Sequence, residues 1–440
     1  MMKRFIDWCI DNKTLVLIFT GVLTVLSIWS LSRVKLDAIP DLSDTQVIIQ
    51  ATYPGQPPQV LEDQVTYPLT TRMLSVPYAK VVRGYSFFHF SLVYILFEDG
   101  TDLYWARSRV LEFLNSMQAK LPRGVTLELG PDATSVGWIF EYALRDTNGK
   151  NSLADLRDLQ DFVLRYELTA VPGIAEVASV GGFKRQFQVE VNPERLYQYN
   201  LTLNDIRRAL KRGNMEMGAR LFQQAEAEFI VLAKGYIQNV EDVKQIPIRS
   251  SKEGAVLRIG DVAYVSEGPD LRRGIADLDG EGEVVGGIVI MRQGEDVIKT
   301  IDRVKAKLKE IQKSLPEGVE IVTTYDRSAL IHRAISNLTQ KLLEELLVVS
   351  IVTLIFLLHV RSALVALVVL PLGVLISFFL MQAFGVAANI MSMGGVAIAI
   401  GVMVDASVVM VENMHKHLEQ IRIKKANLTN KDYWDATRVS

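Results

Sequence analysis

Two acidic residues lie in an otherwise apolar stretch near the end of the chain, where their carboxylates could carry protons. Asp405 and Glu412 are the only charged residues between positions 389 and 413. At about 100° per residue, they share one helix face with Gly394 and Gly401. A carboxylate within a membrane is costly, so it usually faces the interior of a bundle and serves a proton or ion path. We therefore predict a proton relay of Asp405 and Glu412, beside two glycines that let another helix approach closely.

Each carboxylate also has a purely structural interpretation. Asp405 could be a buried acid held by a partner cation or by backbone groups, although its place near the centre of the stretch favours the proton relay. Glu412 lies near the end of the stretch, where it could simply be solvated. The sequence alone leaves both interpretations open for Glu412.

Methionine is concentrated in the same region, which would suit a soft metal. Six of the chain's 13 methionines lie between residues 381 and 414: Met381, Met391, Met393, Met403, Met410 and Met414. Thioethers suit Cu(I), whereas zinc and magnesium favour histidine, thiolate or carboxylate. The five histidines form no i, i+4 ligand pair, and the single cysteine, Cys9, excludes a cysteine-based zinc site. From spacing alone, methionine as apolar filler in a helix remains the better explanation.

Membrane helices would have to position these residues, and the chain has four apolar segments of suitable length. They cover about residues 15–31, 338–358, 363–388 and 389–413, so that residues 1–34 hold the first span and residues 414–440 follow the fourth. Lysine and arginine lie before the first span, between the second and third, and after the fourth. By the positive-inside rule, the N-terminus is cytoplasmic and the long region between the first two spans is periplasmic. We expect a multi-pass protein of a Gram-negative inner membrane.

The region between the first two spans contains an internal repeat. The pattern Leu-Pro-x-Gly-Val occurs at residues 121–125 and again at residues 315–319. At the same offset of 194 residues, Asp102 matches Asp296, and each precedes a helical pattern. Internal duplication explains these matches better than two helices that converged on similar turns.

The repeat divides this region into three predicted domains. Two βαβ-type subdomains would frame a cleft, the first over residues 35–132 and the second over residues 133–184 and 271–330. A separate domain over residues 185–270 is inserted into the second. Smaller elements are predicted as well, including one strand over residues 86–97 and a short helix over residues 203–211 that is capped near Asn204.

Composition argues against two other classes of protein. The chain has 48 basic and 50 acidic residues, and this balance does not suit a nucleic-acid partner. No nucleophile–base set or phosphate-binding glycine loop lies near a plausible cleft, and the Gly-x-Gly at residues 280–282 lacks the strand–helix context of a dinucleotide site. We therefore expect neither an enzyme nor a bound cofactor.

The apolar stretch resembles a known family. Residues 394–406, followed by Glu412-Asn413, resemble the fourth transmembrane helix of resistance-nodulation-cell division (RND) efflux pumps, and residues 36–44 and 53–55 fit as well. Drug exporters of this family usually carry two adjacent aspartates here, so the chain is similar to the heavy-metal efflux group. Zinc, cobalt and nickel exporters usually show Asp-Phe-Gly and then Asp-Gly-Ala. This chain has Ala-Ile-Gly and Asp-Ala-Ser, which is closer to the copper/silver subgroup.

The resemblance implies a fold class and a function. The fold would be an α+β membrane protein with transmembrane helices and large periplasmic ferredoxin-like βαβ subdomains that carry an inserted docking domain. The protein would be a secondary active transporter, a proton-driven antiporter that exports Cu(I) or Ag(I) from the inner membrane. It would work as a homotrimer with a periplasmic adaptor (a membrane fusion protein) and an outer-membrane channel.

The resemblance also implies roles for individual residues. Asp405 would be the proton-relay carboxylate, and Met391, Met403 and Met410 match positions of a methionine relay that carries the monovalent metal. Leu271 departs from the pattern, because a further relay methionine is expected in that region.

The family pattern is longer than this chain. RND pumps have two homologous halves and twelve spans, and the lysine that partners the relay aspartate lies in the second half, as does a periplasmic methionine cluster. We therefore expect an amino-terminal fragment that does not transport alone. Two alternatives are an RND exporter of divalent zinc, cobalt or nickel, and a membrane-anchored periplasmic sensor or scaffold without transport.

Overall fold

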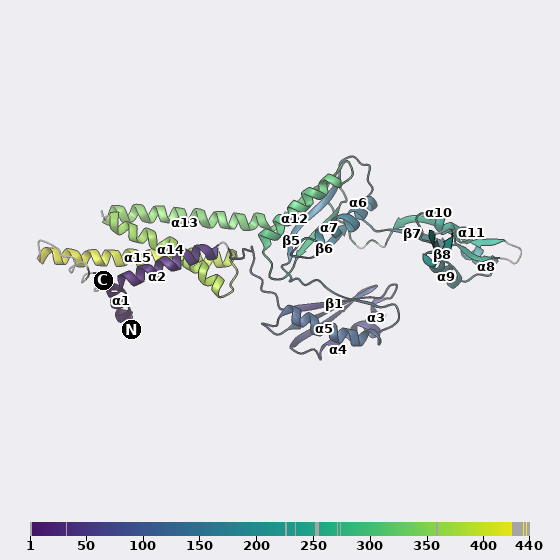
Figure 1. Cartoon of the computed structure of the whole chain (residues 1–440), viewed down its shortest axis with the longest axis horizontal. Helices are drawn as coiled ribbons and strands as arrows, with labels where there is room; N and C mark the ends of the chain where they lie inside the picture. Colours follow the sequence, from purple (N-terminus) through teal and green to yellow (C-terminus); the bar gives the residue numbers. More distant parts are fainter. Residues whose placement is uncertain are drawn as a thin grey trace.

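The computed structural model of the chain describes residues 2–31, 33–224, 227–233, 235–250, 255–270, 272, 274–357, 360–424, 434 and 437. The molecule is elongated, with long helices at one end, two α+β units in the middle and an inserted unit at the other end (Figure 1). We call the long helices the helical bundle. It contains α2 (Lys13–Leu31), α13 (Arg327–Leu357), α14 (Val360–Ala383) and α15 (Ile390–Lys424), and α1 (Met2–Asp11) precedes it.

The first α+β unit is a four-stranded antiparallel sheet with helices against one face (Figure 1). Its strands, in the sheet order β2-β3-β1-β4, are β2 (Ala79–Ser86), β3 (Phe90–Phe97), β1 (Gln46–Thr52) and β4 (Thr126–Leu129). Its helices are α3 (Pro58–Leu61), η1 (Glu62–Thr66), α4 (Tyr67–Met73) and α5 (Leu103–Gln118). Every second residue of β3 is buried, which gives the sheet one apolar face for these helices.

The predicted strand over residues 86–97 is wrong in one respect, because the structure has two strands there. Ser86 ends β2, and β3 begins only at Phe90. Between them the chain turns at His89, whose φ of +77° lies in the left-handed region. The aromatic residues Phe87 and Phe88 in this turn carry no turn signal, so composition alone suggested one continuous strand.

The second α+β unit repeats the topology of the first. Its sheet has the order β14-β5-β13-β6, with β14 (Val319–Asp326), β5 (Trp138–Asp146), β13 (Val285–Met291) and β6 (Ile174–Gly181). The helical elements are α6 (Leu153–Leu159), η2 (Gln160–Leu164), α7 (Arg165–Thr169), α12 (Val297–Ile311) and η3 (Gln312–Ser314). Numbered within each unit, both sheets read 4-1-3-2 with two helical crossings, which is the ferredoxin-like split βαβ arrangement.

Matching residues of the repeat occupy matching places in the two units. Asp102 caps α5 by accepting a hydrogen bond from the Trp105 N–H (2.7 Å), and Asp296 caps α12 by accepting one from the Lys299 N–H (3.1 Å). An internal duplication predicts this agreement of caps and topology.

The inserted unit leaves and re-enters the second unit through two paired strands. These are β7 (Arg185–Val191) and β12 (Ala263–Pro269), which pair antiparallel along their whole length. Between them lie α8 (Pro193–Gln198), α9 (Leu203–Gly213), β8 (Met217–Gln224), β9 (Ala227–Ala233), α10 (Val240–Gln245), β10 (Pro247–Ser250), β11 (Val256–Arg258) and α11 (Ile259–Val262). The cap of α9 is Thr202 rather than Asn204, because Thr202 and Asp205 form a reciprocal capping box.

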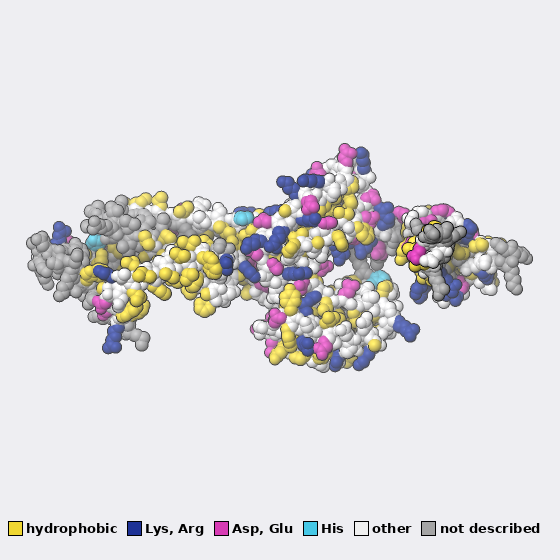
Figure 2. Space-filling model, in the orientation of Figure 1, with side chains coloured by type: hydrophobic (Ala, Val, Ile, Leu, Met, Phe, Trp, Pro, Cys, Tyr) yellow, Lys and Arg dark blue, Asp and Glu magenta, His cyan; other side chains and the backbone are white. Residues whose placement is uncertain are grey.

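Two of the described helices are long and apolar enough to cross a membrane on length and composition, namely α2 and residues Ile390–Ile423 of α15. Val368–Ala383 of α14 is apolar but shorter. Hydrophobic side chains cover much of the visible face of the helical bundle, whereas charged side chains are frequent on the two α+β units (Figure 2). The arrangement of four spans stays a prediction.

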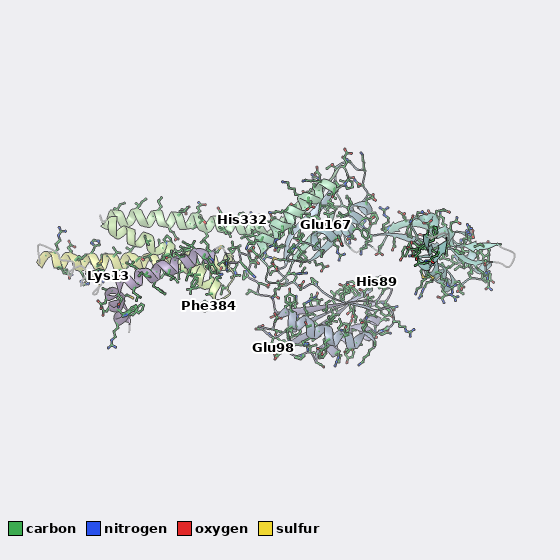
Figure 3. The ribbon with its side chains drawn as sticks, viewed as in Figure 1. Lys13, His89, Glu98, Glu167, His332 and Phe384 are labelled. Atoms are coloured by element: carbon green, nitrogen blue, oxygen red, sulfur yellow. The ribbon has the colours of Figure 1, made fainter. Side chains whose placement is uncertain are left out.

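The helix boundaries differ from the predicted spans. α13 begins at Arg327 rather than near residue 338, because Ile331 in its first turns is buried in the core of the second unit. His332 marks the point where α13 passes from that unit into the bundle (Figure 3). α14 ends at Ala383 rather than at residue 388, just before Gly385 with its φ of +70°. The long α15 continues past residue 413 to Lys424.

Candidate proton and metal site on helix α15

Helix α15 carries the five residues predicted for proton or metal chemistry and the two predicted packing glycines, and its start is well defined. The Asn389 side chain accepts a hydrogen bond from the Ser392 N–H (2.9 Å), and the Asn389 N–H donates to the Ser392 hydroxyl (2.8 Å). The helix contacts α13 and α14. Its buried residues Met393 and Ile400 pack in the core of the bundle with side chains of α14, and each is less than 10% exposed.

Asp405 lies on the opposite, exposed face of α15. Its neighbours on that face, Val402 and Val409, are 67% and 62% exposed. Within the part of the chain that the structure describes, the Asp405 carboxylate has no hydrogen bond or ion pair. Glu412 is also exposed, but its carboxylate pairs with the Lys416 ammonium one turn later (2.7 Å). The two predicted relay residues thus share an open face, and only Glu412 has a partner there.

The predicted packing glycines also face open space. A Cβ added to Gly394 or Gly401 would meet no atom within 4 Å among the described residues. The close helix approach is instead at Gly373 of α14, where an added Cβ would lie 2.6 Å from the Met403 sulfur. Gly373 was not among the predicted packing residues. The sequence does contain a signal for this contact. Gly373 is the only glycine between residues 363 and 384, a stretch without charged residues, and a small residue in such a helix lets another helix approach closely.

The three predicted relay methionines do not converge within this chain. Met403 is half-buried and packs against the core of the bundle, next to Gly373. Met391 and Met410 are 70% and 54% exposed. No group of three or more His, Cys, Asp or Glu side chains that could hold a metal ion occurs among the described residues. Leu271 lies outside the described residues.

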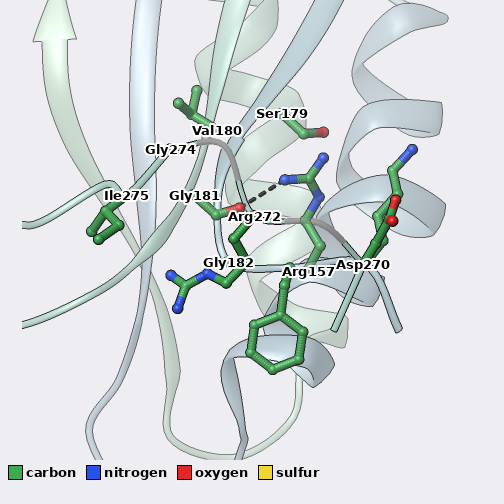
Figure 4. A pocket seen from close by; sticks show the side chains of 11 residues that line it. Arg157, Ser179, Val180, Gly181, Gly182, Asp270, Arg272, Gly274 and Ile275 are labelled. Carbon is green, nitrogen blue, oxygen red and sulfur yellow. Dashed lines mark hydrogen bonds between the residues drawn. The ribbon is translucent and has the colours of Figure 1, made fainter. Parts of the chain in front are cut away.

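A cavity of about 510 Å³ lies elsewhere, where the second unit meets the inserted unit (Figure 4). Its lining includes Arg157 and Arg272. Each guanidinium already faces a carboxylate, Arg157 with Asp161 at 2.9 Å and Arg272 with Glu283 at 2.5 Å. These pairs leave little net positive charge to attract an anion, and we assign this cavity no part in the site.

Comparison with known proteins agrees with the motif on α15. The model of the AcrB/AcrD/AcrF family matches residues 5–437. "Cation efflux system protein CusA" of Escherichia coli (strain K12) is 56% identical over 436 residues, which is 99% of this chain and 42% of that protein. "Cobalt-zinc-cadmium resistance protein CzcA" of Cupriavidus metallidurans is 35% identical over 425 residues, covering 95% of this chain and 40% of that protein.

A solved structure has the same fold. The "X-ray crystal structure of a heavy metal efflux pump, crystal form II" matches with a TM-score of 0.81 and 29% sequence identity, covering 94% of this chain and 41% of that one. The chain therefore spans about two fifths of the length of the relatives it matches. Because the family match covers nearly the whole chain, the predicted resemblance is confirmed, and the chain belongs to the AcrB/AcrD/AcrF family of RND pumps.

Proposed function

We propose that the chain is part of a proton-driven exporter of monovalent metal cations, Cu(I) or Ag(I). The observation that carries this proposal is the pattern of identity, which is 56% to a protein named for cation efflux and 35% to one named for cobalt, zinc and cadmium resistance. Thioether-rich helix α15 supports a soft monovalent metal as the cargo, since divalent zinc or cobalt would favour histidine or carboxylate ligands.

In this proposal the open face of α15 is the proton path. Asp405 binds and releases the proton near the middle of the apolar stretch, and Glu412 exchanges it near the end, where Lys416 holds the Glu412 carboxylate. Gly394 and Gly401 lie on the same face and leave room for another helix to approach. A carboxylate on an apolar helix surface supports this role, because lipid alone would not stabilise its charge.

The proposed metal path follows the thioethers of Met391, Met403 and Met410. Met403 supports it best, because it is only half-buried and its sulfur lies at the contact between α15 and α14. Met391 and Met410 are exposed residues and can meet a metal ion or further protein.

Location and partners belong to the same proposal. The chain would lie in the inner membrane with its N-terminus in the cytoplasm and with both α+β units in the periplasm. It would assemble as a homotrimer with a periplasmic adaptor and an outer-membrane channel, and the inserted unit would be the docking domain. The position of the inserted unit at the end of the molecule remote from the helical bundle supports this assignment (Figure 1).

A test of metal tolerance decides the cargo. The protein is produced from its complete gene in a bacterial host that lacks its own copper and silver exporters. We expect growth at higher concentrations of silver and copper salts, with no change in tolerance to zinc. Protection against zinc alone would contradict the proposed cargo, and protection against no metal would contradict export itself.

Exchange of Met403 for leucine tests the thioether path. Leucine has a similar volume, so the Met403→Leu variant should lose less than about 1.5 kcal/mol of stability while losing a soft ligand. We expect silver tolerance to fall clearly at an unchanged protein level. Met381→Leu is the matched control, because Met381 is also half-buried against the core of the bundle. Equal tolerance in both variants would show that the Met403 sulfur serves only packing.

A further inference from the structure

The start of α15 is joined to the segment that follows α2. Residues 35–38 run beside residues 388–390 and form three backbone hydrogen bonds with them: Asp37 N–H to Ala388 O (2.9 Å), Ala388 N–H to Lys35 O (3.1 Å) and Ile390 N–H to Ala38 O (3.3 Å). Ala38 and Ala388 are almost completely buried. A displacement of the first turn of α15 therefore moves residues 35–38 with it.

The same segment is joined to the second α+β unit by an ion pair between the half-buried Asp37 and the buried Arg327. Arg327 is the first residue of α13 and is 2% exposed, and its Nη2 lies 2.9 Å from a carboxylate oxygen of Asp37. This pair is aligned poorly for a hydrogen bond, and neither Nε nor Nη2 of Arg327 has a hydrogen-bond partner in the described chain. The Nη1 group donates to the Val136 carbonyl beside β5. Arg327 thus holds Asp37 mainly by charge.

Arg327 is itself fixed to the sheet of the second unit. α13 follows β14 without a loop, since Asp326 ends the strand and Arg327 begins the helix. The Asp326 carboxylate pairs with the Lys305 ammonium of α12 (2.6 Å) and accepts a hydrogen bond from the Ser328 N–H (2.9 Å). Because these contacts fix the first turn of α13, the Arg327 side chain moves with the second unit.

Hydrophobic side chains also link the second unit to the helical bundle. The core of the second unit and the core of the helical bundle are separate clusters of buried residues, and Leu36 and Ile335 pack against both. Burial raises the pKa of the Asp37 carboxyl, and the nearby Arg327 opposes this rise. An ion pair with a buried partner contributes little net stability, so stability alone does not explain the Asp37–Arg327 pair.

We propose that the Asp37–Arg327 pair is the joint through which movement of α15 reaches the second α+β unit. Asp37 and Arg327 are then positioning residues, which touch neither the proton nor the metal. The inference rests on the proposed function, because it makes proton binding at Asp405 the event that moves α15.

The experiment replaces both charges by apolar residues of similar size. Removing one partner of a buried pair leaves an unpaired charge and destabilises the fold, whereas replacing both is often neutral. The Asp37→Leu/Arg327→Met variant should therefore fold with a melting temperature near that of the parent. We expect its maximal rate of Ag(I) export to fall about tenfold, as a lost coupling between sites would give, at an unchanged half-saturating Ag(I) concentration. A folded variant that exports at the parental rate would overturn the proposal.

A second variant covers the case in which the double variant does not fold. Asp37→Asn keeps an oxygen that can accept the Ala38 N–H (2.6 Å), but it leaves the Arg327 charge unpaired, so a local loss of stability is expected. We expect faster hydrogen exchange both at residues 388–392 and at residues 326–331, with Asp44→Asn, an exposed aspartate of the same segment, as the unchanged control. Unchanged hydrogen exchange at both places would contradict the proposed link through Asp37 and Arg327, whether or not the protein exports metal.

The two proposals fail in different ways. A parent protein without silver export, or an Asp405→Asn variant with normal export, would refute the proposed function. Loss of export in Asp405→Asn, together with parental export in the folded double variant, would refute the joint alone.

Discussion

Replacing Asp405 with asparagine is expected to reduce silver and copper tolerance to the level of cells without the gene. Asparagine has nearly the same volume as aspartate, but it cannot bind and release a proton. Within the described residues, the Asp405 carboxylate is exposed and has no partner, so its replacement should change the stability of the chain by less than about 0.5 kcal/mol. Lost tolerance at an unchanged protein level would therefore report lost proton transfer rather than misfolding.

The measurement pairs silver tolerance with metal-dependent proton flux in membrane vesicles. Glu419→Gln is the matched control, because Glu419 is another exposed carboxylate on α15 and lies closer to its end. It should retain both tolerance and flux. Asp405→Glu, which keeps a titratable carboxylate, should retain part of the flux. Normal flux and tolerance in Asp405→Asn would remove Asp405 from the proton path.

The repeat was predictable because its signals are local. Asp102 and Asp296 each precede a helix whose apolar residues recur at helical spacing, and a side-chain cap needs only the next three residues. The predicted start of the inserted unit, residue 185, coincides with the first residue of β7. Local chemistry therefore gave most elements of both α+β units.

The direction in which α15 packs was not predictable. Periodicity shows that Asp405 and the two glycines share a face, but it does not show which face meets a neighbouring helix. That choice depends on Gly373 of α14, which is far from Met403 in the sequence and close to it in space. The burial of Arg327 was not predictable for a similar reason. A charged residue is expected at the surface, and the burial of Arg327 depends on Asp37, which is remote in the sequence.

Replacing Gly181 with alanine is expected to destabilise the second unit where it leads into the inserted unit. Gly181 ends β6 with a φ of +70°, and an added Cβ would lie 2.2 Å from the Val284 carbonyl oxygen. Its own carbonyl accepts a hydrogen bond from Arg157 (2.7 Å), which restricts any backbone shift (Figure 4). We expect the free energy of unfolding to fall by about 3 kcal/mol, from left-handed strain of about 1–2 kcal/mol and from overpacking.

Gly280→Ala separates the two causes. Gly280 has a similar φ of +76°, but an added Cβ there would meet no atom within 4 Å in the described chain. Its substitution should cost only the backbone strain, about 1–2 kcal/mol. Urea unfolding of the purified full chain in detergent gives both values, and hydrogen exchange at β6 and β13 should rise only for Gly181→Ala. Equal losses in the two variants would mean that the Val284 carbonyl can move aside, and the turn into the inserted unit would then be adaptable rather than fixed by close packing.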